Sequence, residues 1–273
     1  GVANPDTLVE NVFSTFLYTG DNSTDTQTFN TGLNMSGDGG LIWFKSRSST
    51  QVGRLIDTVR GTNESLIPSS SNASGGLGAD GLTFLNNGFS IGWTGGDLGA
   101  ANDYVAWSFK KASKFFDIVT YDGDGNAGRQ ISHNLGAVPG MILIKGLTNT
   151  EWSVYHRGVD GSAPEDYFLS LNGTAARGDN SGYWNDTAPT SSVFTVGNQN
   201  NVNGSSISYV AYLFGHDTSS DGMIQCGSFT DSSSGFTVDL GFEPQWLFTK
   251  RTDSTGNWEI VDVMRGFTAD RGY

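Results

Sequence analysis

The chain has 273 residues, of which 38 are glycine and only 6 are proline. Hydrophobic residues make up 36% of the sequence and aromatic residues 12%, which is enough to form packed cores and excludes a disordered chain. The formal net charge is −13, and no basic cluster offsets it, so nucleic acid is excluded as a partner. No apolar run reaches the roughly 20 residues that a membrane span requires.

Three segments of the chain repeat the same features in the same order, about one hundred residues apart. Opening strands are expected at residues 13–20, 116–123 and 224–230, and apolar strands that end in lysine at residues 41–45, 141–145 and 246–250. An Arg-Gly pair follows each lysine. The first two copies close with Tyr-Val-Ala and a further aromatic residue, at residues 104–109 and 209–214. The third copy has no counterpart of this closing strand.

This period is long enough for a compact domain and too long for a solenoid unit. We therefore predict three tandem units, at residues 1–112, 113–219 and 220–273. Because the third unit is incomplete, we expect that the polypeptide continues or that a neighbouring chain completes it.

Short alternating strands, separated by Asp-Gly, Asn-Gly and serine-rich turns, predict the fold within each copy. We expect an all-β protein of tandem antiparallel β-sandwich domains, jelly-roll-like, with over about 35% strand and under about 10% helix. Residues 236–240 alternate cleanly and predict a strand. The only candidate helix is at residues 54–60.

Two kinds of charged residue recur in all three copies: Lys45, Lys145 and Lys250, and Arg60, Arg157 and Arg265. One interpretation is a ligand-binding pair, for example for a sugar carboxylate. The other is structural: the arginine pairs with a carboxylate and fixes a loop, and the glycine that follows adopts a positive φ. Three residues before these arginines stand Asp57, Val154 and Asp262, so the carboxylate is not common to all copies.

No catalytic constellation recurs. The three histidines are solitary, and together with the single cysteine, Cys226, they cannot form a Cys/His zinc site at ligand spacing. With only one cysteine, the chain also cannot form an internal disulfide. Asp122, Asp124 and Asn126 place oxygen atoms at alternate positions, as a calcium loop does, although a glycine-rich hairpin turn between Tyr121 and Ile131 is the favoured explanation. We expect no enzyme activity and no cofactor apart from this candidate calcium ion.

Three aromatic residues lie in loops rich in glycine, asparagine and aspartate: Trp93, Tyr183 and Trp184. Such rings can form stacking platforms for carbohydrate, although isolated loop aromatics more often cap a core. They are the candidate sugar-binding residues, together with Arg60 and Arg157.

The second copy carries Phe116-Asp-Ile118-Val-Thr-Tyr121 and Tyr209-Val-Ala-Tyr212-Leu-Phe214, with Ile-Ser-His-Asn-Leu-Gly between them. In this order of motifs it resembles a repeat domain of virion structural proteins of marine tailed bacteriophages. The first and third copies resemble the same domain through Leu41-Ile-Trp43 and Trp258-Glu-Ile260. The resemblance implies no activity or binding residue.

The resemblance implies a non-enzymatic structural component of a phage virion, such as a tail fibre, tail tip or surface appendage. Its partners are then other virion proteins or copies of itself, its location is the virion or the extracellular space, and it contributes to host attachment. The alternative is a carbohydrate-binding adhesin that contacts host-surface glycan. A glycan-degrading enzyme is the third hypothesis.

Overall fold

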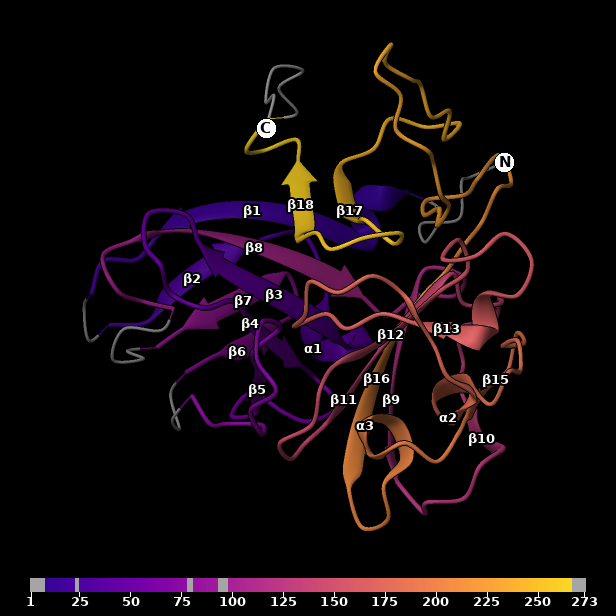
Figure 1. Cartoon of the computed structure of the whole chain (residues 1–273). Coiled ribbons are helices and arrows are strands. Elements are labelled where there is room, and N and C mark those ends of the chain that lie inside the picture. Colours follow the sequence, from indigo (N-terminus) through magenta and orange to yellow (C-terminus); the bar gives the residue numbers. More distant parts are fainter. Residues whose placement is uncertain (1–7, 23–24, 78–80, 93–97, 267–273) are drawn as a thin grey trace.

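The computed structural model describes residues 8–22, 25–77, 81–92 and 98–266. Strands account for 35% of the chain and helices for 7%, which confirms the expected all-β sandwich class, with the strand content at the lower edge of the prediction (Figure 1). In the described part of the chain, no helix is both long and apolar enough to cross a membrane.

The first copy forms a five-stranded antiparallel sheet that faces a three-stranded sheet. The order in the large sheet is β1 (Phe13–Thr19), β8 (Asp103–Lys110), β3 (Gly40–Ser46), β4 (Arg54–Asp57) and β5 (Ser65–Leu66). The small sheet has the order β2 (Gln27–Asn30), β7 (Gly88–Ile91) and β6 (Thr83–Leu85). The closing strand β8 therefore lies between the opening strand β1 and the lysine-ended strand β3.

The second copy repeats this order. Its large sheet runs β9 (Phe116–Asp122), β16 (Ser208–Phe214), β11 (Met141–Gly146) and β12 (Ser153–His156), and β10 (Arg129–Ser132) pairs with β15 (Val193–Val196) opposite it. A further pair is β13 (Tyr167–Phe168) and β14 (Gly178–Asp179). The common strand order that the repeat predicts is confirmed. The unit boundaries at residues 112 and 219 stay predictions.

Helices in the described chain are single turns. They are α1 (Met35–Asp38), α2 (Ser181–Trp184) and α3 (Asn200–Asn203), with the 3₁₀ turns η2 (Val9–Asn11) and η3 (Pro164–Asp166). The helix expected at residues 54–60 is wrong, because residues 54–57 form β4. Leu55 and Ile56 point to opposite sides of this strand and are buried in two different cores, which a helix of this length could not achieve.

The third copy is a hairpin of β17 (Trp246–Lys250) and β18 (Trp258–Asp262). The strands expected at residues 224–230 and 236–240 do not form. In the other copies, the first of these strands pairs with the closing strand, and the second pairs with β7 or β15. The described third copy offers neither partner, so the backbone there has no sheet to join.

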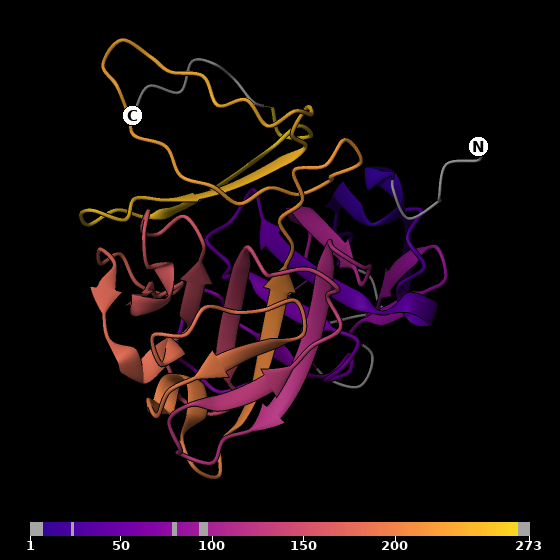
Figure 2. The same ribbon diagram turned by 90° about the vertical axis from the view of Figure 1, so that its right-hand side faces the viewer.

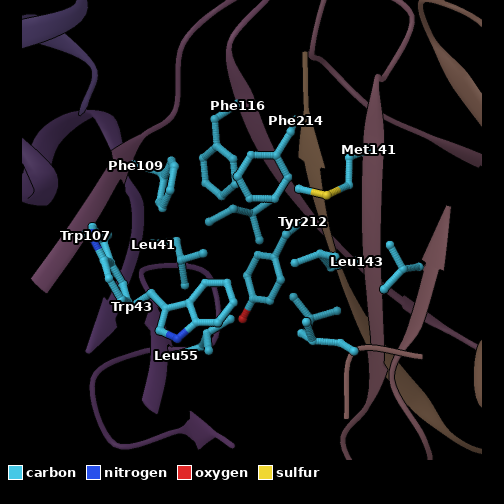
Figure 3. Packing of buried hydrophobic residues seen from close by; sticks show 14 of the residues in the cluster. Leu41, Trp43, Leu55, Trp107, Phe109, Phe116, Met141, Leu143, Tyr212 and Phe214 are labelled. Atoms are coloured by element: carbon cyan, nitrogen blue, oxygen red, sulfur yellow. The ribbon is translucent and has the colours of Figure 1, made fainter. Parts of the chain in front are cut away.

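The large sheets of the first two copies pack face to face over one hydrophobic core, which we call the shared core. Leu41, Trp43 and Phe109 enter it from the first copy, and Tyr212 and Phe214 enter it from the second (Figure 3). The hairpin lies at one end of the two sheets (Figure 2) and packs Trp246, Phe248, Trp258 and Ile260 against this core. The opposite face of each large sheet packs against its own small sheet. The two copies are therefore joined by their largest apolar surface.

Leu143→Ala is expected to destabilise both copies at once, by about 2–5 kcal/mol, because Leu143 is fully buried in the shared core. Hydrogen exchange in increasing urea, followed by mass spectrometry of peptides from β3 and from β11, measures this. The two peptides should lose protection in one transition. Val138→Ala, at an exposed position, is the control. Loss of protection in β11 with β3 unchanged would contradict the shared core.

Candidate functional site

The strand registers show which residues of the three copies are equivalent. Asp57 ends β4 opposite Leu41, His156 ends β12 opposite Met141, and Asp262 ends β18 opposite Trp246. The structural counterpart of the two aspartates in the second copy is therefore His156. The sequence spacing, counted back from Arg157, had placed Val154 there. Counting back from the arginine gave the wrong residue because the turn from His156 to Arg157 is shorter than the turn from Asp57 to Arg60.

Asp57 and Arg60 form a buried ion pair that also binds the second copy. Arg60 Nε lies 2.6 Å from Asp57 Oδ2, and both side chains are almost fully buried. The hydroxyl of Tyr212 donates to the same oxygen at 2.8 Å and accepts from Arg60 Nη2 at 3.1 Å. Burial disfavours the charge of Arg60, but Tyr212 and Asp57 outweigh it and raise the pKa of Arg60. Burial also raises the pKa of Tyr212, so its hydroxyl keeps the proton that it donates.

Asp262 and Arg265 build the same unit at the end of the hairpin. Arg265 Nε lies 2.5 Å from Asp262 Oδ2, and the indole nitrogen of Trp107 donates to that oxygen at 3.1 Å. The guanidinium carbon of Arg265 lies 5.0 Å from the centre of the Trp107 ring. Trp107 and Tyr212 hold the same position on the two closing strands. The third copy therefore binds the first in the way that the first binds the second.

Two tryptophans make a second set of contacts between copies. The indole of Trp152, in the second copy, donates to the carbonyl of Ile67 in the first at 2.9 Å. The indole of Trp258, in the third copy, donates to the carbonyl of Ser170 in the second at 2.8 Å. Ile67 and Ser170 are equivalent, since each follows a residue paired with the strand before it, Leu66 or Leu169. Each contact thus runs from one copy to the copy before it.

The recurring lysines have a structural role in the hairpin loops. Lys45 Nζ donates to the carbonyls of Ser46 and Gln51, and Lys250 Nζ donates to that of Arg251. Lys145 is fully buried, and its ammonium donates to the carbonyl of Thr148 at 2.8 Å. Burial lowers the pKa of Lys145 to about 8. All three lysines thus donate to backbone carbonyls, which favours the structural interpretation.

An open cavity of 430 Å³ lies where the hairpin meets the first copy, and we call it the junction cavity. Four aromatic rings line it: Trp43, Trp107, Phe248 and Trp258. Phe248 stacks on Trp258, and Trp43 meets Trp107 and Phe248 edge to face. Lys45, Gln51 and Arg265 add hydrogen-bonding groups to the wall. No aspartate or glutamate is among the described lining residues, so the wall is suited to binding a flat apolar or sugar ring and offers no carboxylate pair.

Two of the loop aromatics predicted to bind sugar, Tyr183 and Trp184, are buried and do not form a surface platform. Trp184 is 2% exposed and Tyr183 is 8% exposed, and both belong to the second copy's own core. Trp184 donates to the carbonyl of Tyr167, and Tyr183 stacks on Phe168 at 3.7 Å. This burial favours the alternative that they cap the core. Trp93 lies outside the described residues.

The two arginines predicted to bind sugar, Arg60 and Arg157, differ in solvent exposure. The Arg60 side chain is buried in the ion pair with Asp57, where a ligand cannot reach it. Arg157 is exposed. The structure does not bring these two residues together.

The candidate calcium loop is held by an asparagine. Asn203, fully buried, donates to Asp124 Oδ1 and to the carbonyl of Asn126, and accepts from the backbone N–H of Asp124. The carboxylate of Asp122 accepts from the hydroxyl of Ser208 instead. Asp124 Oδ1 and the carbonyl of Asn126 are thus engaged in closing the loop. No cluster of three or more His, Cys, Asp or Glu side chains in the described chain could hold a metal ion.

His156 belongs to the second copy, and Cys226 belongs to the opening segment of the third, where its backbone N–H donates to His216 Nδ1 at 3.1 Å. The backbone N–H of Gly158 donates to His156 Nδ1 at 3.1 Å. Burial, together with the charges of Arg157 and His216, lowers the pKa of His156 to about 4. Burial raises the pKa of Cys226 to about 12, so its thiol stays protonated and is a poor nucleophile.

Sequence reasoning did not find the contacts between copies or the junction cavity. A signal was present: Trp152 and Trp258 stand at the same place in their copies, two residues before Val154 and Ile260. The aromatic positions 107 and 212 also recur on the closing strands. These recurrences alone do not distinguish separate cores from a shared one.

The chain belongs to the family described as "Domain of unknown function (DUF7483)", which it matches over residues 10–270. No curated protein and no solved structure matches the chain.

Asp262→Asn is expected to loosen the hairpin by about 2 kcal/mol. The new amide nitrogen would face Arg265 or Trp107, both of which are donors. Hydrogen exchange of β17 and β18 measures the effect and should rise at least tenfold. Asp253→Asn, an exposed carboxylate that pairs with Arg251 in the same hairpin, is the matched control and should leave exchange unchanged. Equal exchange in the two variants would refute the role of Asp262.

Acid is expected to destabilise the fold through His156. Its pKa falls from the ordinary 6.5 to about 4 in the folded chain, so between these pH values only the unfolded chain binds the proton. The contribution of His156 is therefore complete above pH 6.5 and falls by about 3 kcal/mol as the pH drops to 4. His156→Asn keeps an acceptor for Gly158 and should flatten the curve of unfolding free energy against pH. A residual slope is expected from His216, whose pKa is also lowered by burial. An unchanged slope in the variant would contradict the assignment.

Proposed function

We propose that this family member is a non-enzymatic structural module of a phage virion, located in a tail fibre, tail tip or surface appendage. In this role it is part of the virion, outside the cell. Its partners are neighbouring virion proteins. The resemblance of its repeats to virion structural domains suggests the setting, and the packing of the copies supports a role in assembly.

The observation that carries the proposal is the contrast between the copies. The first two bury their apolar positions and are joined by a shared core and by buried hydrogen bonds. The third leaves Phe229 and Phe236 about half exposed, although the equivalent residues of the other copies pack against neighbours. An apolar surface of this kind is typical of a protein that binds another protein.

A carbohydrate-binding adhesin is the second candidate, and the junction cavity favours it. Its aromatic wall and hydrogen-bonding rim are the features that sugar-binding sites combine. Contact with host-surface glycan also agrees with a position on a tail appendage. Saturable binding on a glycan array that Trp258→Ala abolishes and Glu259→Ala preserves would establish this activity.

The virion role predicts that the chain is present in intact particles in a fixed ratio to the capsid protein. Particles from a phage that encodes the chain would be purified on a density gradient and quantified by mass spectrometry with isotope-labelled peptides. The ratio should stay constant through a second gradient and a high-salt wash. Peptides found in the soluble lysate and absent from the particles would disprove the virion assignment.

A further inference from the structure

One position in the wall of the junction cavity carries a tryptophan in two copies and a glycine in the other. The strand registers make three positions equivalent, each two residues before a core residue of the second hairpin strand: Gly53, Trp152 and Trp258. In the second and third copies the indole donates to a carbonyl of the preceding copy. Gly53 has no side chain and lines the junction cavity. A Cβ added there would lie 3.3 Å from Pro68 Cγ and 3.4 Å from Trp43 Nε1, and both of these residues also line the cavity. The cavity thus opens at the position where the other two copies carry an indole.

The recurring lysine and arginine meet across the junctions between copies. At the junction of the first and second copies they are Arg60 and Lys145, and both side chains are almost fully buried. Burial first, and then the charge of Arg60, lowers the pKa of Lys145, so the two cations lie near each other. At the junction of the third and first copies the equivalent residues are Arg265 and Lys45, and both line the cavity. The side chain of Arg265 is 28% exposed, against 3% for Arg60. Where Gly53 replaces the indole, the same pair of cations is therefore open to a ligand.

Both cations keep hydrogen-bonding capacity for a ligand. The ammonium of Lys45 has three N–H groups and donates to two backbone carbonyls. Arg265 donates to Asp262 through Nε and to a backbone carbonyl through Nη2, which leaves Nη1. The chain carries 28 Asp and Glu against 15 Lys and Arg, yet the described lining residues include these two cations and no carboxylate. The cavity therefore favours a ligand that brings a carboxylate of its own.

We infer that the junction cavity binds one ring that carries a carboxylate. The ring lies against the aromatic wall, in the place that an indole fills in the other copies, and the carboxylate binds Lys45 and Arg265. Gly53 is the residue that admits the ring. In the adhesin considered above, the ring is a hexuronic acid residue of a surface glycan, and this choice of sugar over an aryl carboxylate rests on that proposed function.

Indole-3-acetate is the first probe, because its ring has the shape of the side chain that position 53 lacks. Indole-3-acetamide is its uncharged counterpart. Titration of the full chain, followed by NMR signals of the probe, should show saturable binding of the acetate that is at least about tenfold tighter than that of the amide. Salt should weaken binding of the acetate, because it screens the two cations. Hydrogen exchange should slow in residues 50–53 and in β18.

Gly53→Trp tests the position of the ring. The variant should fold, since the equivalent residues of the other two copies are tryptophans, and its indole should fill the cavity and weaken acetate binding at least about tenfold. Gly161→Trp is the matched control. It adds the same indole to an exposed turn of the second copy, where nothing lies within 4 Å of the added Cβ, and should bind like the unaltered chain. If Gly53→Trp does not fold, the comparison of acetate with amide on the unaltered chain decides.

Tetrasaccharides of hexuronic acids and of the corresponding neutral hexoses test the sugar source. The acidic sugars should bind and should displace indole-3-acetate, and the neutral sugars should do neither. Binding of neutral sugars alone, lost in Trp258→Ala, would keep the adhesin function and refute the carboxylate. Binding of indole-3-acetate with no sugar bound would keep the cavity chemistry and refute the sugar.

Three further results would overturn the inference as a whole. They are absence of saturable binding by every acidic probe, equal binding of indole-3-acetate and its amide, and unchanged binding in a folded Gly53→Trp variant. The particle measurement is independent of all of these, since its failure removes the virion setting and leaves the cavity to be judged by the probes.

Discussion

One buried carboxylate oxygen, Oδ2 of Asp57, holds two copies of the repeat together. It accepts from Arg60 of its own copy and from the Tyr212 hydroxyl of the next. In water such bonds would compete with solvent, but here they lie within an apolar core, where an unpaired charge is costly to bury. The relative position of the two sheets therefore depends on this atom keeping both partners. Asp262 positions the hairpin in the same way, since its Oδ2 accepts from Arg265 and from Trp107 of the first copy.

As a result, hydrogen bonds link each of the three copies to both of the others. Asp57 reaches from the first copy to the second, and Asp262 reaches from the third to the first. Trp152 and Trp258 each reach back to the preceding copy. The molecule is accordingly built as one block around the shared core, in which identical contacts are reused between successive copies. In the second copy the position of the aspartate is held by His156, which accepts from the backbone N–H of Gly158 in its own copy.

The sequence predicted the class of the fold, which depends on local alternation, and predicted that the first two copies share one strand order, which depends on the repeat. It did not predict that the copies share a core. The signal was the unbroken apolar run Leu41-Ile-Trp43-Phe44, which is typical of a strand covered on both faces. The candidate site was predicted less well. Tyr183 and Trp184 lie in polar loops by sequence, yet tertiary contacts bury both, and the equivalence of His156 with Asp57 emerged only from the strand registers.

The separation of these partners along the chain has a consequence for synthesis. Trp107 donates to Asp262, which lies 155 residues later in the chain, and Asp57 accepts from Tyr212 across the same separation. The first large sheet therefore emerges from the ribosome with one apolar face, including Leu41 and Trp43, that nothing yet covers. Such long-range contacts slow folding and expose nascent chains to aggregation. The small sheet of the first copy, whose strands all lie within residues 27–91, is complete before β16 is synthesised and covers the other face of the large sheet.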